Sequence, residues 1–249
     1  MRSVKVFGER NTGTNALAEF VARNSESILL PGVFSALPGA DSSVLAQPIR
    51  RERERLIDFA FAEQPPTLQW KHCATYFSDK DIATFKDCTT LILVRNPVSW
   101  CLGLWKNPYN RLVDLPESFD EFISLPWKTV ARERLDAREL CPPDLINLKM
   151  SHYKRFASRG LSAGHVVKVL PFEELVCQPL SVWAKIKTVL HKHKDNPILV
   201  ENSTKDPSKS LSYYQNYYGA EKWRTEISAK TYRVLEAAID WNLYGELLK

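Results

Sequence analysis

The chain has 249 residues, of which 44% are hydrophobic and 25% are charged, a balance typical of one globular domain over residues 1–249. The net charge of +5 suits an anionic ligand, but the charges are scattered rather than gathered in a basic arm, which argues against a nucleic-acid partner. Five cysteines without a CxxC spacing indicate reduced thiols and argue against a disulfide framework or a zinc site.

The first predicted element is a short apolar strand, Val4 to Gly8, which runs into a polar turn and then a helix. Leu17, Phe20 and Val21 lie at i, i+3 and i+4, so this helix has one buried face. The first N–H groups of a helix lack partners within the helix, and a glycine before them lets the backbone approach a ligand. A strand, a turn and a helix N-terminus in this order favour an anion site.

The turn consists of Arg10, Asn11, Thr12, Gly13, Thr14 and Asn15. A guanidinium group, two hydroxyl groups and unpaired amide groups within so short a segment indicate a loop that binds phosphate or sulfate. An ordinary strand-to-helix turn is the alternative. The loop is not a Walker A loop, since Thr14 stands where the lysine should be. It is not a Rossmann loop either, because that loop needs three glycines in the pattern GxGxxG.

The next predicted elements are a helix over residues 51–62 and a short strand over residues 68–72. A buried strand follows over residues 89–94, whose β-branched and apolar side chains are typical of a parallel sheet. This strand ends at Arg95, and Pro97 fits the first turn of a further helix. Arg95 therefore lies where open α/β sheets bind ligands, although a salt bridge to a nearby carboxylate explains it equally well.

The second half of the chain continues this alternation. Helices are predicted near residues 145–159, 179–190 and 229–248, and a strand follows His165. Strands that alternate with helices predict a parallel α/β sheet. The segments 108–127 and 213–218, the second rich in tyrosine, either line an acceptor pocket or pack a loop against the domain.

Three motifs together resemble the sulfotransferase family that uses 3′-phosphoadenosine-5′-phosphosulfate (PAPS). The family's first loop has a basic residue before Ser/Thr-Gly-Thr, which resembles residues 10–14, and a later strand ends in Arg-Asn-Pro, as at Arg95. A histidine precedes that arginine at the spacing of His72, and residues 165–175 and 219–224 resemble the late strand and the closing loop. The resemblance is to a divergent, bacterial-type cytosolic member. It implies a P-loop-like three-layer α/β/α fold with a central parallel sheet.

The resemblance implies a role for each motif residue. His72 would be the general base that takes the acceptor proton, with Arg10 and Lys71 as further catalytic candidates. Lys71 helps only if the strand has ended before it, because neighbours on a strand point to opposite sides. A hydrogen-bonded histidine at a strand end is the alternative for His72. The residues implied at the 5′-phosphosulfate are Arg10, Asn11, Thr12, Gly13, Thr14 and Asn15, and those implied at the 3′-phosphate are Arg95, Ser99, Trp223 and Arg224.

Three positions depart from the family pattern. Asn11 stands where a lysine or arginine usually precedes the Ser/Thr-Gly-Thr triplet. Ala16 replaces a tryptophan that often stacks on adenine. Gly103 occupies the place of a serine that contacts the 3′-phosphate, and Ser99 is the candidate substitute.

The predicted activity is sulfuryl transfer from PAPS to a hydroxyl or amine of a small molecule or glycan, with no metal and with release of 3′,5′-adenosine bisphosphate. One alternative is an ATP-dependent small-molecule kinase, which would need a loop lysine and a magnesium-binding carboxylate. Another is a non-catalytic module that binds a nucleotide or a sulfated glycan. The first strand begins within the first few residues and no apolar run is long enough to span a bilayer, so we expect a cytoplasmic protein with no membrane partner.

Overall fold

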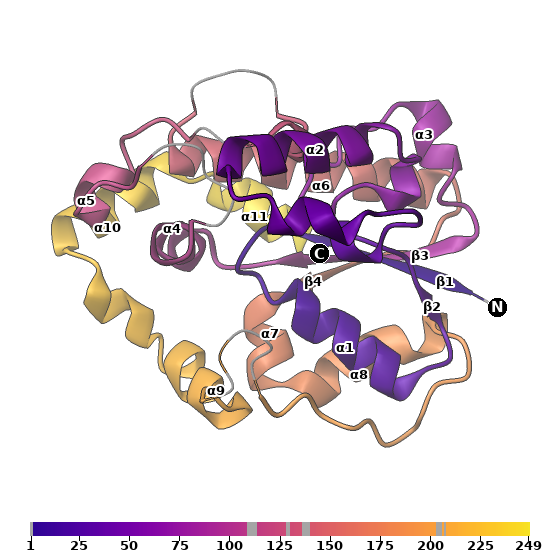
Figure 1. Ribbon diagram of the computed structural model, residues 1–249. Helices are drawn as coiled ribbons and strands as arrows, with labels where there is room; N and C mark the ends of the chain where they lie inside the picture. Colours follow the sequence, from indigo (N-terminus) through magenta and orange to yellow (C-terminus); the bar gives the residue numbers. More distant parts are fainter. Residues whose placement is uncertain (1, 109–113, 128–129, 136–139, 203–205, 207) are drawn as a thin grey trace.

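The computed structural model describes residues 2–108, 114–127, 130–135, 140–202, 206 and 208–249. At the centre of this part of the chain lies a four-stranded parallel sheet in the order β2-β1-β3-β4. The strands are β1 (Ser3–Gly8), β2 (Ile28–Leu29), β3 (Cys88–Val94) and β4 (Val167–Pro171). Helices cover both faces of the sheet (Figure 1), which confirms the predicted three-layer α/β/α fold with a central parallel sheet.

The helices form two layers (Figure 1). One layer contains α1 (Thr14–Asn24), α7 (Phe172–Cys177) and α8 (Pro179–Ile186). The other contains α2 (Arg50–Ala62), α3 (Asp79–Ala83), α6 (Pro142–Ser162) and α11 (Trp241–Leu247). Toward the side to which the strands run, at the left in Figure 1, lie α4 (Pro97–Lys106), α5 (Phe119–Phe122), α9 (Leu211–Gly219) and α10 (Ala229–Ala238).

Short 3₁₀ helices join these elements. They are η1 (Phe34–Ala36), η2 (Ser42–Ala46), η3 (Pro66–Leu68), η4 (Ala131–Glu133), η5 (Lys187–Val189) and η6 (Lys222–Glu226). Two of them, η4 and η6, contribute residues to the site described below.

Strand β3 is central because its residues are apolar or β-branched and all seven are buried. It pairs with β1 on one side and with β4 on the other. Gly8 of β1 lies opposite Leu93 of β3, so β1 and β3 end at the same edge of the sheet. Parallel strands present their carboxyl ends together, which brings the loop after β1 next to Arg95.

The main core surrounds the sheet and includes Leu17, Phe20 and Val21, each at most 2% exposed, as the spacing of the first helix predicts. A smaller core lies beneath α2 and is formed by Phe34, Leu37, Ile57, Phe61, Trp70 and Val130. The charged residues 50–55 at the start of α2 are mostly on the surface. Glu54 is the exception, because it is buried and its carboxylate lies 2.6 Å from the Arg132 guanidinium.

The predicted strand over residues 68–72 is wrong. Pro66 has a fixed φ and no N–H group to donate to a ladder, and the chain forms η3 there instead. Residues 71 and 72 then form a turn whose backbone hydrogen-bonds to the ends of two other segments: Lys71 N–H donates to Gly32 C=O at 3.0 Å, and Gly8 N–H donates to Lys71 C=O at 3.0 Å. The side chains of Lys71 and His72 therefore do not have to point to opposite sides, as neighbouring side chains on a strand do.

The predicted final helix is divided into α10 and α11. The Asp240 side chain accepts a hydrogen bond from Leu243 N–H and so starts a new helix. Asn147 of α6 stabilises the break, since its amide donates to Ala238 C=O at 2.8 Å and its oxygen accepts from Asp240 N–H at 2.9 Å. Because of this break, Trp241 and Glu236 lie on different helices.

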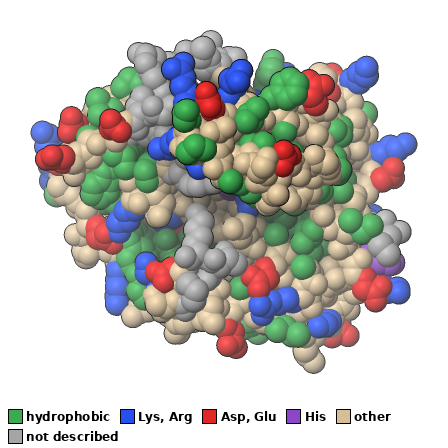
Figure 2. Space-filling model, in the orientation of Figure 1, with side chains coloured by type: hydrophobic (Ala, Val, Ile, Leu, Met, Phe, Trp, Pro, Cys, Tyr) green, Lys and Arg blue, Asp and Glu red, His purple; other side chains and the backbone are tan. Residues whose placement is uncertain are grey.

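On the face shown in Figure 2, Lys and Arg side chains are interspersed with Asp and Glu side chains. Within the described ranges, no helix combines the length and the apolar character needed to cross a bilayer. The thiols of Cys73, Cys88 and Cys101 are buried and those of Cys141 and Cys177 are half-buried, all of them unbridged, as the sequence predicts. Residues 109–113 of the predicted acceptor-lining segment lie outside the described residues.

Candidate functional site

The loop after β1 folds back on itself before α1 begins. Asn11 and Gly13 have left-handed backbone conformations, with φ of 64° and 77°. The Thr12 hydroxyl and N–H both donate to Glu9 C=O, at 2.5 and 3.3 Å. No side chain caps α1, and Leu17 N–H donates to Gly13 C=O at 3.0 Å as the first turn closes. The earlier N–H groups of α1 therefore remain available to an anion, and the helix dipole favours one there.

The hydroxyl groups of the loop are less available than the sequence suggests. Thr12 is fully buried and uses its hydroxyl within the loop, and Thr14 is 4% exposed. Asn15, in contrast, is exposed at the first turn of α1. The geometry therefore favours anion binding through backbone N–H groups over binding through threonine hydroxyl groups.

Arg10 turns into the protein. Its side chain is 3% exposed, and Nη2 donates to Glu133 Oε1 at 2.7 Å. Its guanidinium carbon lies 4.8 Å from the Trp127 ring centroid, and its Nε lies 3.4 Å from Glu9 Oε1. Two buried carboxylates thus attract this guanidinium, which explains why it points away from the surface of the loop. The predicted contact of Arg10 with a phosphosulfate does not fit this orientation.

Lys71 supplies a cation at the loop instead. Its ammonium donates to Asn15 Oδ1, which places the charge at the first turn of α1. Gly32 makes room for this arrangement, because a Cβ at that position would lie 2.9 Å from Lys71 Cβ. No strand is present at residues 71 and 72, so the condition under which the sequence allowed Lys71 a role is met. Lys71 therefore brings positive charge to the place where Asn11 lacks it.

His72 also contacts the loop. Its Nδ1 lies 2.6 Å from Gly8 C=O, and its ring meets the Trp70 ring edge to face at 5.0 Å. A carbonyl only accepts hydrogen bonds, so Nδ1 carries the proton and Nε2 keeps its lone pair. Burial, followed by the charge of Lys71, holds the pKa of His72 well below its ordinary value of 6.5, although the Gly8 carbonyl opposes the shift. The ring is therefore neutral at neutral pH and able to accept a proton.

Arg95 binds the same loop from the end of β3. Its Nη1 donates to Asn11 C=O at 2.8 Å and its Nε donates to Ser99 Oγ at 2.8 Å. The guanidinium carbon lies 5.3 Å from the Phe172 ring centroid and 5.0 Å from that of Tyr218, and the residue is 4% exposed. Among the described residues no carboxylate makes a direct ion pair with Arg95, but Glu173, which accepts from Asn96 N–H at 3.0 Å, interacts with it electrostatically.

The structure explains why glycine, and not the serine of the family pattern, stands at position 103. A Cβ at Gly103 would lie 2.8 Å from Arg95 Nη1, so a serine does not fit while Arg95 holds this position. The Gly103 carbonyl accepts from Asn11 Nδ2 at 2.9 Å, and Asn107 C=O accepts from the same amide at 3.1 Å. Asn11 thus ties the loop to α4, a role that a lysine at this position would not fill.

The tyrosines of α9 pack against one another and over Arg95. Tyr213 stacks on Tyr217 and Tyr214 stacks on Tyr218, with centroid distances of 6.2 Å in both pairs. Tyr218 also meets Phe172 of α7 edge to face at 4.8 Å. Of the two roles that the sequence allowed for this segment, the structure favours packing.

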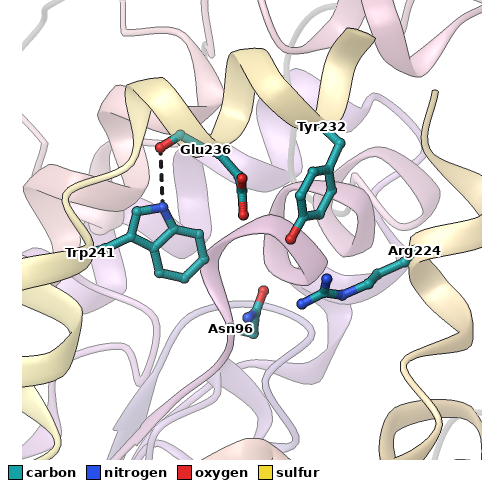
Figure 3. Close-up of a pocket in the computed structure, with 5 residues that line it drawn as sticks. All are labelled: Asn96, Arg224, Tyr232, Glu236 and Trp241. Carbon is teal, nitrogen blue, oxygen red and sulfur yellow. Dashed lines mark hydrogen bonds between the residues drawn. The ribbon is translucent and has the colours of Figure 1, made fainter. Parts of the chain in front are cut away.

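A cavity of about 350 Å³ opens beside Arg95 and is lined by Asn96, Arg224, Tyr232, Glu236 and Trp241 (Figure 3). The Arg224 guanidinium and the Tyr232 hydroxyl point toward Asn96, and the Glu236 carboxylate points into the same space (Figure 3). Arg224 has a 47% exposed side chain and pairs with Glu221 at 2.9 Å. Trp223 is 1% exposed and belongs to the main core, so its predicted contact with a cofactor does not fit its position.

The sequence signalled only part of this cavity. Arg224 was expected near the 3′-phosphate residues, and it does line a space next to Asn96. Tyr232, Glu236 and Trp241 have no motif around them, since they are ordinary residues of helices that the fold brings to the end of β3. In the described segments no group of three or more His, Cys, Asp or Glu is arranged to hold a metal ion.

Comparisons with known proteins give one weak likeness. No protein-family model matches the chain, and no curated protein matches it. A solved structure, described as the sulfotransferase domain from the curacin biosynthetic pathway, is similar with a TM-score of 0.49 and 11% sequence identity, over 96% of this chain and 99% of that chain. At this level the likeness does not assign an activity.

Proposed function

We propose that this protein is a sulfotransferase that uses PAPS and binds the sulfuryl end of the donor at the loop after β1. The observation that carries this proposal is that two motifs, distant in the sequence, meet on that loop: His72 binds Gly8 and Arg95 binds Asn11. A base and a buried cation therefore lie on either side of one anion-binding turn. PAPS supplies an activated sulfuryl group and a phosphate leaving group, and the residues of this chain position and stabilise both.

The residues present fit the anionic end of such a donor. The N–H groups at the start of α1 have no side-chain cap, and the Lys71 ammonium lies at the same turn. Backbone N–H groups, a helix dipole and a lysine together stabilise negative charge on a phosphate or sulfate. Arg10 then acts from behind the loop, as part of its support.

The cavity fits the nucleoside end. Its volume of about 350 Å³ lies within the range of small-molecule sites. Arg224 and the Asn96 amide offer donors to a 3′-phosphate, with the charge of Arg95 behind them. Tyr232 and Trp241 offer aromatic faces to a purine, and the Glu236 carboxylate accepts hydrogen bonds from N–H groups.

The residues at the loop suit transfer to a hydroxyl or amine. His72 Nε2 takes the proton of the acceptor, because Nδ1 is committed to Gly8 C=O and the ring is neutral. Lys71 and the α1 N-terminus stabilise the charge that develops on the leaving phosphate. The acceptor belongs to small molecules or glycans, and we propose that the protein acts in the cytoplasm.

The kinase alternative receives less support. A kinase needs a carboxylate that can bind magnesium near the phosphates. Two carboxylates beside the loop, Glu9 and Glu133, are fully buried and lie 2.7 and 3.0 Å from the Lys149 ammonium. They are therefore occupied by a cation of the protein itself. A non-catalytic binding module is separated from an enzyme by the His72 variant described in the Discussion.

Calorimetric binding of 3′,5′-adenosine bisphosphate, 5′-AMP and Mg-ATP tests the proposal. The ratio of the affinities for the bisphosphate and for 5′-AMP measures what the 3′-phosphate contributes. A charge-assisted hydrogen bond contributes about 1.5–3 kcal/mol, so we expect a ratio of about tenfold or more. Arg224→Ala should lower this ratio toward one, whereas Lys71→Met should weaken both ligands to a similar extent.

Arg233→Ala is the matched control, because Arg233 is exposed on α10 and does not line the cavity. Transfer from sulfur-labelled PAPS to a panel of hydroxyl and amine acceptors then tests activity. Tighter binding of Mg-ATP than of the bisphosphate would contradict the proposal and favour the kinase. Equal binding of the bisphosphate and 5′-AMP by the unmodified protein would also contradict it.

A further inference from the structure

Four charged side chains form a buried cluster behind the loop: Glu9, Arg10, Glu133 and Lys149. Each is at most 3% exposed. Lys149 Nζ lies 2.7 Å from Glu9 Oε2 and 3.0 Å from Glu133 Oε1, and Arg10 Nη2 lies 2.7 Å from Glu133 Oε1. Two cations and two anions balance, which allows the cluster to remain ionised away from water.

This cluster joins three separate parts of the chain. Glu9 and Arg10 belong to the loop after β1, Glu133 ends η4, and Lys149 lies in α6. Buried ion pairs of this kind add little net stability compared with apolar side chains of the same volume. They do fix geometry, because each hydrogen bond has a preferred length and direction.

The geometry that they fix is that of the segment around His72. Lys149 Nζ donates to His72 C=O at 2.8 Å, and the Glu133 backbone carbonyl accepts from Ala74 N–H at 2.8 Å. The cluster thus holds the backbone at two points, His72 and Ala74. On the other side it holds Glu9, whose neighbour Gly8 accepts the hydrogen bond from the His72 ring. The base and the loop are therefore fixed relative to each other through one set of side chains.

We propose that Lys149 and Glu133 are positioning residues that hold His72 against the anion loop in the Nδ1-protonated tautomer. This inference rests on the proposed role of His72 as the base. Neither residue touches a ligand, since both are fully buried. A change in either should affect the rate of proton transfer much more than the affinity for the nucleotide.

Charge gives the proposal a second readout. The charged groups around His72 are Lys71, Arg10 and Lys149, with Glu9 and Glu133 as their partners in the cluster. Lys149→Met removes one cation and leaves a net negative charge in the cluster. The pKa of His72 should then rise, because the imidazolium form becomes easier to accommodate.

The test compares Lys149→Met and Glu133→Gln with Lys154→Met, a matched lysine of the same helix that pairs with Glu246 at the surface. In transfer assays with labelled PAPS, we expect kcat to fall about 100-fold for Lys149→Met, as misplacement of a catalytic group does, with the affinity for 3′,5′-adenosine bisphosphate nearly unchanged. Glu133→Gln keeps the shape of the side chain, so kcat should fall less in this variant than in Lys149→Met. Lys154→Met should behave like the unmodified protein.

Nuclear magnetic resonance of the His72 ring provides a readout that does not depend on activity. The chain has five histidines, and the resonance of His72 is identified as the one that disappears in His72→Gln. We expect ring nitrogen shifts of the Nδ1-protonated tautomer in the unmodified protein, and a tautomer mixture with a raised pKa in Lys149→Met. An unchanged tautomer and pKa in both folded variants would overturn the positioning role. Failure of the unmodified protein to bind the bisphosphate would instead contradict the proposed function.

Discussion

At the carboxyl edge of the sheet, the ends of β1 and β3 are built alike, but the groups around their buried arginines differ. At the end of β1, the motif residue Arg10 is buried and Lys71, from a distant segment, faces the anion loop. At the end of β3, the motif residue Arg95 is buried and Arg224, again from a distant segment, lines the cavity. In both places the arginine that follows the strand supports the loop, and a cation from a distant segment lies on the open side of the proposed site.

The two buried arginines differ in what neutralises them. Arg10 contacts the carboxylates of Glu9 and Glu133, so its field is largely cancelled at the loop. Arg95 is held by two aromatic rings, a hydroxyl and a carbonyl. Its acidic neighbour Glu173 interacts with it only electrostatically, without a direct ion pair, so more of its charge is left to act on an anion than at Arg10. The comparison indicates that a buried arginine can support a loop with or without adding to the attraction for an anion.

The largest expected effect is at the β1 end. His72→Ala should lower kcat by about 10²–10⁴, the range that a general base contributes. The affinity for 3′,5′-adenosine bisphosphate should stay nearly the same, because His72 does not line the cavity. Steady-state assays with labelled PAPS and calorimetry measure the two quantities separately. A variant with unchanged transfer would show that His72 is a structural residue at the end of a turn.

A smaller effect is expected at the β3 end from Gly103→Ala. The added Cβ would lie 2.8 Å from Arg95 Nη1, and the guanidinium is held in place by Ser99 and Asn11. Such overpacking costs about 1–3 kcal/mol, so denaturant unfolding should show a loss of stability and the bisphosphate should bind more weakly.

Gly245→Ala is the control for this prediction, because it lies in α11 with open space where its Cβ would be. Alanine is the better helix former, so that variant should gain up to about 1 kcal/mol. If Gly103→Ala gained stability in the same way, Arg95 would be free to move and its fixed position would be disproved.

The smallest expected effect sharpens the comparison through pH. A base must be neutral to act, and the pKa of His72 lies below 6.5, so kcat/KM should hold to below pH 6.5 before it falls. Lys71→Met removes a cation that lowers this pKa, and the fall should then begin at a higher pH. Arg224→Ala, at the other end of the site, should leave the pH at which the fall begins unchanged. If kcat/KM began to fall at the same pH in Lys71→Met as in the unmodified protein, Lys71 would have no influence on the pKa of the base.

Much of the fold could be predicted from the sequence, because the signals for its elements are local. The apolar run of β3, the buried positions of α1 and Pro97 at the start of α4 each express a preference of the chain over a few residues. The failures occurred where a single residue overrides a pattern. The 3₁₀ helix that begins at Pro66 takes the place of the start of the strand expected before His72, and Asp240 starts a new helix within the last one.

The site divides in the same way. Position in the sequence predicted that Arg95 lies beside the loop after β1, since β1 and β3 end at one edge of the sheet. His72 reaches the same loop from a turn and not from the end of a strand. Position in the sequence did not determine the direction in which charged side chains point. That depends on the sum of all nearby charges, and Glu133 and Lys149 are remote in the sequence from Glu9 and Arg10.

The sequence by itself therefore determined the type and order of the main strands and helices, and the turn that suits an anion. The tertiary structure alone decided that Arg10 supports the loop, that the Lys71 ammonium lies at the first turn of α1, and that Arg224 meets Tyr232, Glu236 and Trp241 around a cavity. The physical reason is the distance along the chain over which each interaction acts. Backbone preferences act between neighbours, whereas burial and charge pairing act between whatever residues the folded chain brings together.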